Sequence, residues 1–453
     1  MSSTLLVANL FITIAIILIL ILALKQSPVI SLIMGALYMG IASGVGAVTT
    51  IETIATGFGN SMTSIGISIG LGVILGKIVA DTGAVQSIAD GITRLCGEKR
   101  ADIGLGLSGF LVSIPVFFDV AFVIIMPLAR FMSKHGKKIP YYAGALVGGL
   151  VIAHTFIPPT PGPLAGSEML GLEVGTTILW GILIGLPSFA ISLFIYDKFF
   201  LSRPGFWIPE RDEDIDPEEE KKEEEKALEL TSGGKSVPPF GLAILPILLP
   251  IVLILCGTAS NAILGEANVP EIIKFVSNKN IAMLIGVFGA YLITIGRMSM
   301  KEVNKTVNRA LSDAGSVLLI TGMGGALGAV LAAAGIGNVL VSVIETVHIH
   351  PVLFAWLVAV VLKAAQGSGT LSMITAISLL APSVGSLNVQ PIFIALAAFS
   401  GSMCISIVND SGFWITTKIA RLTTLGGFKI CSLMCFIISI VSLILIMAAS
   451  FIF

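Results

Sequence analysis

The sequence predicts an all-α integral membrane protein built from two inverted repeats, each with five transmembrane helices and one re-entrant hairpin. Three observations support this prediction. The 453 residues are 55% hydrophobic and only 12% charged, with a mean hydropathy of +1.00, whereas soluble domains carry about 25% charged residues. A strongly acidic segment divides the chain into halves of similar size. The two halves match each other after a shift of 252 positions.

The acidic segment sets the expected domain boundaries. Residues 210–229 contain twelve acidic and four basic side chains, and such a segment can neither enter a bilayer nor form a hydrophobic core. We therefore expect a first transmembrane repeat at 1–203, a charged cytoplasmic linker at 204–237, and a second, inverted repeat at 238–453.

The shift of 252 positions needs no gap. It places residues 70–85 on 322–337, with glycine meeting glycine at several positions, Gly83 and Gly335 among them. The same shift places 115–118 on 367–370 and 158–160 on 410–412. Because one offset aligns both glycines and unusual motifs, the pattern indicates an old duplication.

The first half has five apolar stretches long enough to span a bilayer. They lie near 5–24, 29–47, 62–80, 140–163 and 177–197. Residues 102–132 have basic clusters on both flanks and Pro115 at the middle. The positive-inside rule places both flanks in the cytoplasm, so this segment is expected to form a re-entrant hairpin.

Five spans is an odd number, so the second half starts on the side where the first ended and is inverted. Its spans are expected near 239–257, 281–296, 314–334, 391–414 and 430–450, with a hairpin near 352–383. Segments 50–61 and 301–312 align with each other and are expected to be separate helices lying in the membrane interface.

Four breaks interrupt the predicted helices, at 113–119, 154–163, 363–372 and 406–414. Inverted repeats with broken helices are typical of secondary transporters, whose site lies near the middle of the membrane where the breaks meet. Free N–H groups at helix starts attract anions, and free C=O groups at helix ends suit cations or hydroxyl donors. The polar groups of these breaks suit a small polyhydroxylated or amino substrate.

The candidate substrate-binding residues all lie in these breaks. They are Ser113, Phe118, Thr160, Lys363, Gln366, Gly367, Ser368, Gly369, Thr370, Asn409 and Ser411. Lys363 could pair with an anionic substrate. The alternatives are that it extends towards the membrane surface or pairs with an aspartate.

Three residues are candidates for carrying a proton: Asp119, Asp410 and His154. An apolar environment favours the uncharged form of a carboxyl group, which could then bind and release a proton near neutral pH. The alternative for each aspartate is that it caps a helix. A histidine also titrates in the required range, but a lone helical histidine is often simply hydrogen-bonded.

No cofactor or metal site is expected. The five cysteines, at 96, 256, 404, 431 and 435, show neither metal-binding nor disulfide spacing, and no His, Cys and carboxylate set has metal spacing. Four of the thiols lie in apolar segments, where a small buried side chain is the simplest interpretation.

Five stretches resemble the gluconate permease (GntP) family of the ion transporter superfamily. They are 75–89, 115–129, 154–163, 363–376 and 407–414, and the resemblance covers nearly the whole chain. It implies a multi-pass protein of the bacterial cytoplasmic membrane that imports a small monocarboxylate together with protons. Gluconate and related sugar acids, D-serine, glycerate and hydroxybutyrate are the substrates implied.

The resemblance also implies roles for the candidate residues. The helix ends at 113–119 and 366–370 would hold the substrate's carboxylate. The substrate's hydroxyl groups would form hydrogen bonds with Thr160, Ser368, Asn409 and Ser411. The motif FFD at 117–119 differs from gluconate carriers, which have glutamate after the aromatic pair, so the substrate stays open.

The sequence leaves two other functions open. A sodium-coupled carrier of the same architecture would bind Na⁺ with hydroxyls and carbonyls around 368–370 and 409–411. A membrane enzyme would need a nucleophile and base or a metal set, and none stands out beyond His154 with Asp119. A channel is disfavoured by the broken helices. No nucleic-acid partner is expected, and a homodimer is expected by analogy alone.

Overall fold

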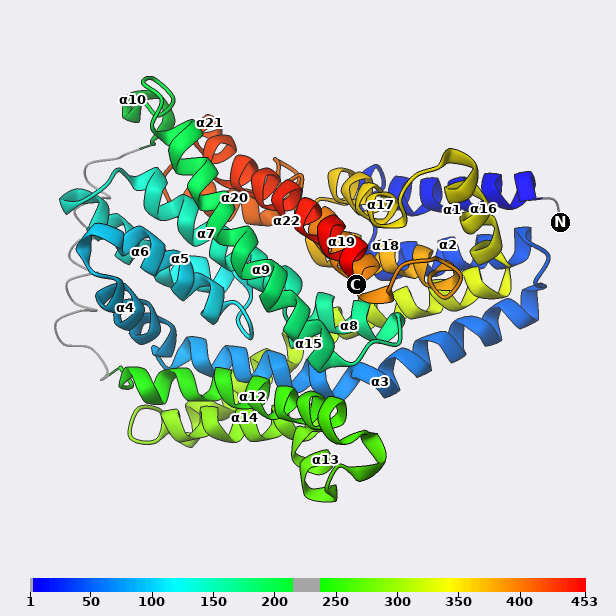
Figure 1. Cartoon of the computed structure of the whole chain (residues 1–453), viewed down its shortest axis with the longest axis horizontal. Coiled ribbons are helices and arrows are strands. Elements are labelled where there is room, and N and C mark those ends of the chain that lie inside the picture. Colours follow the sequence, from blue (N-terminus) through cyan, green and yellow to red (C-terminus); the bar gives the residue numbers. More distant parts are fainter. Residues whose placement is uncertain (1–2, 215–236) are drawn as a thin grey trace.

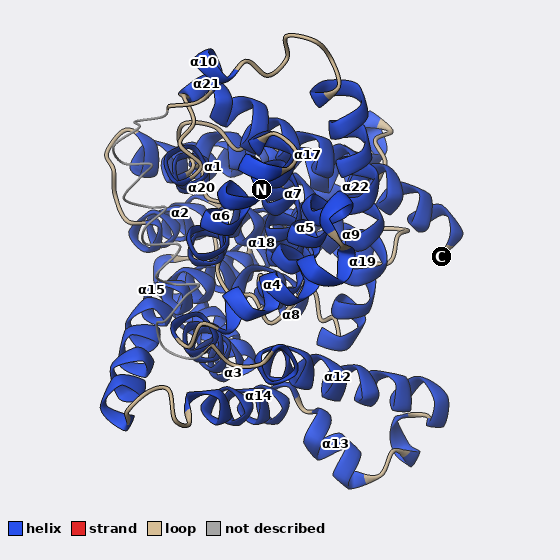
Figure 2. Cartoon of the chain, turned by 90° about the vertical axis from the view of Figure 1, so that its left-hand side faces the viewer, coloured by secondary structure: helices blue, strands red, loops and turns tan. Residues whose placement is uncertain are grey.

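The computed structural model describes residues 3–214 and 237–453, so most of the acidic segment lies outside the described residues. Within the described ranges the chain is helical and contains no β-strand (Figure 2). Seven helical stretches are long and apolar enough to cross a membrane. An eighth is added if α13 and α14, which meet at an angle of 63°, form one broken span.

The first half contains nine α-helices (Figure 1). They are α1 (Ser3–Leu22), α2 (Pro28–Ala42), α3 (Ala47–Asp81), α4 (Ala84–Cys96), α5 (Ala101–Val112), α6 (Phe118–His135), α7 (Ile139–Phe156), α8 (Pro161–Met169) and α9 (Val174–Tyr196). Proline occupies one of the first two positions of α2, α7 and α8, where its missing N–H costs no helical hydrogen bond.

The second half repeats this order after the short helix α10 (Pro209–Asp212). It comprises α12 (Phe240–Leu264), α13 (Glu271–Ser277), α14 (Lys279–Thr294), α15 (Met300–Ala333), α16 (Ile336–Val347), α17 (Pro351–Gln366), α18 (Gly369–Val384), α19 (Pro391–Gly401), α20 (Ser411–Ile419), α21 (Thr424–Gly427) and α22 (Leu433–Ile452).

Helix boundaries follow the shift of 252 positions. The shift carries α3 from 47–81 to 299–333, and α15 spans Met300–Ala333. It carries α4 from 84–96 to 336–348, and α16 spans Ile336–Val347. The glycine that separates each of these pairs adopts a left-handed conformation, with φ +77° at Gly83 and +78° at Gly335. These helix boundaries match the offset found in the sequence, and the duplication itself stays a prediction.

The two longest helices pass through the body of the molecule and form its most extensive helix–helix contact (Figure 1). α3 has 35 residues and α15 has 34. The expectation of separate interface helices at 50–61 and 301–312 is wrong, because both segments are continuous with the spans that follow them. No proline interrupts either helix, and a capping box of Ser299 and Glu302 begins α15.

Two predicted spans are short in the structure. α2 has 15 residues and α19 has 11, so at 1.5 Å per residue they reach about 22 and 16 Å. The hydrocarbon core of a bilayer is about 30 Å thick, and neither helix crosses it alone. The inverted orientation of the two halves stays a prediction.

All four predicted breaks are confirmed. Residues 113–117 separate α5 from α6, 157–160 separate α7 from α8, 367–368 separate α17 from α18, and 402–410 separate α19 from α20. One glycine of α3 lets the chain at the first break come close. A Cβ on Gly76 would lie 2.1 Å from the Pro115 carbonyl oxygen.

The first residues of the predicted linker are folded against the second half. The Asp212 carboxylate is fully buried and accepts a 2.6 Å hydrogen bond from Lys429 and a 2.8 Å hydrogen bond from the Ile208 backbone N–H. Burial alone would raise the pKa of Asp212. The hydrogen bonds from Ile208, Lys429 and Arg211 outweigh burial and hold this pKa below its usual value.

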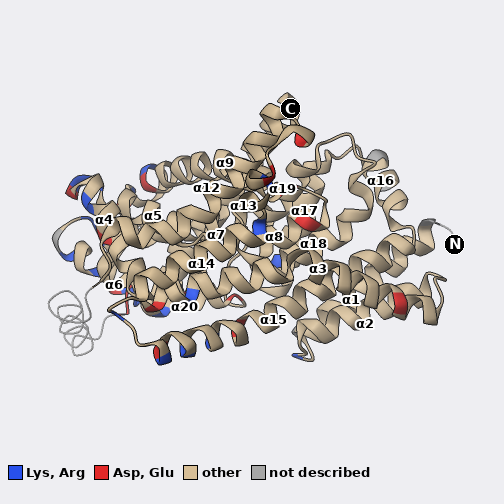
Figure 3. Ribbon diagram, turned by 90° about the horizontal axis from the view of Figure 1, so that it is seen from below, with Lys and Arg blue, Asp and Glu red and all other residues tan. Residues whose placement is uncertain are grey.

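Charged side chains are unevenly distributed. In Figure 3 they gather at one end of the molecule, around α4 and α6, and along the start of α15, while most of the body carries neither sign. This distribution fits an apolar body embedded in lipid.

Candidate functional site

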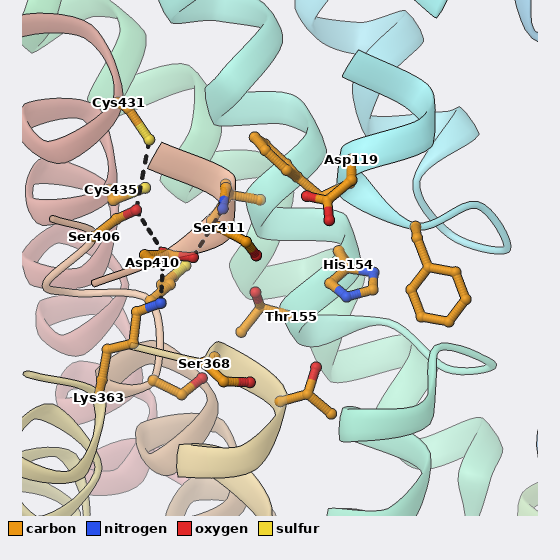
Figure 4. Close-up of a pocket in the computed structure, with 18 residues that line it drawn as sticks. Asp119, His154, Thr155, Lys363, Ser368, Ser406, Asp410, Ser411, Cys431 and Cys435 are labelled. Atoms are coloured by element: carbon orange, nitrogen blue, oxygen red, sulfur yellow. Dashed lines mark hydrogen bonds and ion pairs between the residues drawn. The ribbon is translucent and has the colours of Figure 1, made fainter. Parts of the chain in front are cut away.

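Residues in three of the breaks and at the end of α7, next to the fourth, line one cavity of about 200 Å³ (Figure 4). Its lining combines aromatic rings, hydroxyls, two thiols, one lysine and two aspartates. The lining residues are Phe117, Phe118, Asp119, Val151, His154, Thr155, Lys363, Ser368, Gly369, Thr370, Ser402, Met403, Ser406, Asp410, Ser411, Gly412, Cys431 and Cys435. Nine of the predicted site residues are among them: Phe118, Asp119, His154, Lys363, Ser368, Gly369, Thr370, Asp410 and Ser411.

Three helices begin at this cavity. α6 begins at Phe118, α18 at Gly369 and α20 at Ser411, and the first residue of each lines the cavity. The start of a helix carries free backbone N–H groups and about half a positive charge. Their convergence makes the cavity suitable for an anionic group such as a carboxylate.

A buried ion pair forms one wall. Lys363 donates hydrogen bonds of 2.6 Å to the Asp410 carboxylate and 2.6 Å to the Gly367 carbonyl oxygen. Its side chain is only 4% exposed, so of the alternatives predicted for Lys363 the structure shows pairing with an aspartate. Asp410 also caps α20 by accepting a 2.9 Å hydrogen bond from the Gly412 N–H. The alternative prediction that this aspartate caps a helix is therefore confirmed.

Asp119 is placed differently. It lies in the first turn of α6, is half-buried, and is not a helix cap, because Phe117 occupies that position. Among the described residues its carboxylate has neither a hydrogen-bond partner nor an ion pair. Figure 4 shows Asp119 and His154 on the same side of the cavity, facing Ser411 and Asp410. The Phe117 ring lies 5.8 Å from the His154 ring.

Five predicted site residues do not line the cavity: Ser113, Thr160, Gln366, Gly367 and Asn409. Ser113 donates to the Val116 carbonyl oxygen within its break. Thr160 donates to the carbonyl oxygens of His154 and Ile157 and so closes the end of α7.

Gly367 and Asn409 hold two breaks together. Asn409 donates a 2.8 Å hydrogen bond to the Ala364 carbonyl oxygen. Gly367 has a φ of +75°, and a Cβ there would lie 2.1 Å from the Asn409 carbonyl oxygen. The two amide atoms of Gln366 are buried without a partner in the described part of the chain.

Sequence reasoning missed a chain of polar groups behind Asp410. Ser406 donates a 2.6 Å hydrogen bond to the Asp410 carboxylate and lies 3.5 Å from the Cys431 thiol (Figure 4). Cys431 and Cys435 both line the cavity. Their spacing of four residues, which puts both thiols on one face of a helix, was the available signal.

No group of three or more His, Cys, Asp or Glu side chains within residues 3–214 and 237–453 could hold a metal ion. The cavity instead offers hydrogen-bond donors and acceptors in a small volume. This arrangement suits binding rather than covalent chemistry.

Comparison with known proteins identifies the chain. Residues 5–452 match the family described as GntP family permease. The chain belongs to this family. It is therefore a transporter rather than an enzyme, and it resides in the cytoplasmic membrane as a multi-pass protein.

Several relatives of this GntP permease have names that state a substrate. It is 30% identical to the gluconate permease of Pseudomonas aeruginosa, over 97% of this chain and 96% of that protein. It is 31% identical to the D-serine transporter DsdX of Escherichia coli, over 96% of both. The solved YdaH transporter of Alcanivorax borkumensis shares the fold, with a TM-score of 0.61 at 14% identity over 92% of this chain and 96% of that one.

Proposed function

We propose that this permease imports a small hydroxylated or amino monocarboxylate by proton symport, with Asp119 as the proton carrier. The supporting observation is the contrast between the two aspartates of the cavity. Asp410 receives hydrogen bonds from Lys363, Ser406 and Gly412, whereas Asp119 receives none from a described residue. These three donors hold Asp410 in place as the partner of Lys363, and Asp119, which has no such partner among the described residues, is the proposed proton carrier.

The substrate carboxylate would bind where the three helix starts converge. The N–H groups at Gly369, Ser411 and Phe118 supply positive partial charge, and Lys363 lies beside them in its ion pair with Asp410. The hydroxyls of Ser368, Thr370 and Ser411 would bind the substrate's hydroxyl or amino groups. A protonated Asp119 would no longer repel the anion, which couples proton binding to substrate binding.

His154 would exchange the proton with Asp119. Its ring lies on the same side of the cavity as Asp119, and its Nδ1 atom is buried without a partner in the described part of the chain. Transport itself would rely on the two repeats being inverted, with the segments that carry the breaks moving against a scaffold that includes α3 and α15.

Uptake of labelled gluconate into proteoliposomes tests the proposal. Accumulation should require an inward proton gradient, should survive replacement of Na⁺ by choline, and should be reduced by unlabelled D-serine, glycerate or 3-hydroxybutyrate if these are carried. Asp119→Asn should abolish gradient-driven accumulation while keeping exchange of internal for external substrate. Asp119→Glu, which keeps the acid, is the matched control.

Two results would contradict the proposal. Accumulation that follows Na⁺ and ignores the proton gradient would favour sodium coupling. Gradient-driven accumulation that persists in Asp119→Asn but is lost in Asp410→Asn would move the proton to the other aspartate.

A further inference from the structure

A second cavity, of about 340 Å³, lies between α3, α8, α15 and α18 and is not part of the site described above. Asn60, Ser61 and Ser64 of α3 line one side, and Glu168 of α8 lines another. The close crossing of α3 and α15 forms its floor. A Cβ on Gly325 would lie 1.8 Å from the Ser61 hydroxyl oxygen, so this serine fits only against a glycine.

The polar side chains of α3 point to a hydrated space. Asn60, Ser61 and Ser64 make no side-chain hydrogen bond to any described residue. Their neighbour Thr63 does not line the cavity and donates to the Gly59 carbonyl oxygen one turn earlier. In a membrane-spanning helix an unsatisfied polar group costs several kcal/mol unless it meets water or a ligand. Three such groups facing one cavity therefore indicate that the cavity is occupied by polar molecules.

Glu168 is the one charged side chain among the described residues that line this cavity. Glu168 would repel a carboxylate, but Lys279 of α14 forms an ion pair with it. The pair is close to neutral as a unit, so the cavity can admit a small acid. The amide of Asn60 and the hydroxyls of Ser61 and Ser64 can both donate and accept, which is what sugar hydroxyls require.

Helix α18 connects this cavity with the first one. Thr370 near its start lines the first cavity and Ser378 lines the second. Eight residues at 1.5 Å each separate them by about 12 Å. Met373, on the same helix between these two positions, packs against Gly162 of α8 so closely that a Cβ on this glycine would lie 2.8 Å from the Met373 sulfur.

We propose that the second cavity is a second binding site for the same hydroxylated monocarboxylate, about two turns along α18 from the first. Asn60, Ser61 and Ser64 bind the hydroxyl groups there. The inference rests on the proposed function, because it takes its ligand from it.

Equilibrium binding of labelled gluconate to the purified full-length permease in detergent tests this site. Labelled D-serine, glycerate and 3-hydroxybutyrate are measured in the same way. We expect about two molecules per wild-type chain. Ser64→Phe fills the second cavity and should reduce this to about one. Thr63→Phe, which puts the same side chain at the neighbouring position of α3 outside the cavity, should leave two.

A milder variant covers the case in which Ser64→Phe fails to fold. Ser61→Ala combined with Ser64→Ala should weaken the affected binding step about tenfold, which corresponds to the loss of roughly one net hydrogen bond. The same variant should lower uptake at limiting substrate by a similar factor.

The outcomes separate the two proposals. A wild-type permease that transports an acid but binds one molecule per chain overturns the second site and leaves the proposed function intact. So does a Ser64→Phe permease that still binds two. A wild-type permease that neither transports nor binds any of the test acids refutes the proposed function, and the second site falls with it.

Discussion

The Lys363–Asp410 pair should show strong energetic coupling. The two side chains are 4% and 14% exposed and lie 2.6 Å apart. Removing one partner of a buried pair leaves the other uncompensated, at a cost of about 3–5 kcal/mol. Lys363→Met leaves Asp410 with the donors Ser406 and Gly412, so we expect the lower end of this range. Asp410→Asn keeps a helix cap at α20 but leaves the lysine charge without its counter-ion.

A double-mutant cycle measures the coupling. The double variant Lys363→Met/Asp410→Asn removes both charges, so its cost should be close to that of one single variant, giving a coupling energy of at least about 2 kcal/mol. Reversible unfolding by SDS in mixed micelles, followed by circular dichroism, supplies the free energies of unfolding.

The chain provides a matched control for this cycle. Lys77 and Asp313 form a looser pair, at 3.6 Å, with side chains 26% and 56% exposed. Their coupling should stay below about 1 kcal/mol, as for surface pairs. If the Lys363–Asp410 cycle gave a value no larger than this control, the pair would not be the buried, desolvated contact that the structure shows.

Two further predictions concern positions away from the ligand. Gly367→Ala should lower the free energy of unfolding by at least about 1–2 kcal/mol, because the residue has a left-handed φ and its new Cβ would clash with the Asn409 carbonyl oxygen. Gly385→Ala should be neutral, because a Cβ there would meet no atom within 4 Å. Equal unfolding midpoints for the two variants would contradict this prediction. Asp212→Asn should destabilise by about 3 kcal/mol at pH 7. The pKa of Asp212 is lower in the folded protein than its unfolded value of about 3.9, so its stabilisation is present above pH 4 and lost as pH falls through the folded pKa. The difference between wild type and Asp212→Asn in thermal unfolding should therefore shrink below about pH 4, and a difference that stays constant between pH 7 and pH 3 would contradict this.

Local chemistry explains what could be predicted from the sequence. Pro115 at residues 113–119 and the paired glycines at 363–372 disfavour a continuous helix, so these breaks were visible in the sequence. The continuity of α3 and of α15 was not visible in the sequence, because nothing in a continuous run of helix-compatible residues marks where a membrane surface lies. The lengths of α2 and α19 were overestimated for the same reason.

The sequence alone determined the membrane class, the offset between the two halves, the four breaks and the residue types that meet at them. These follow from hydropathy, from the special backbones of proline and glycine, and from self-similarity along the chain. The tertiary structure decided which polar groups share a cavity. Lys363 and Asp410 are 47 positions apart, and Asp119 is farther still. Their partnerships depend on how separate helices pack, which no local pattern encodes. The same packing gave one aspartate three donors and left the other with none, and created a second cavity along α3.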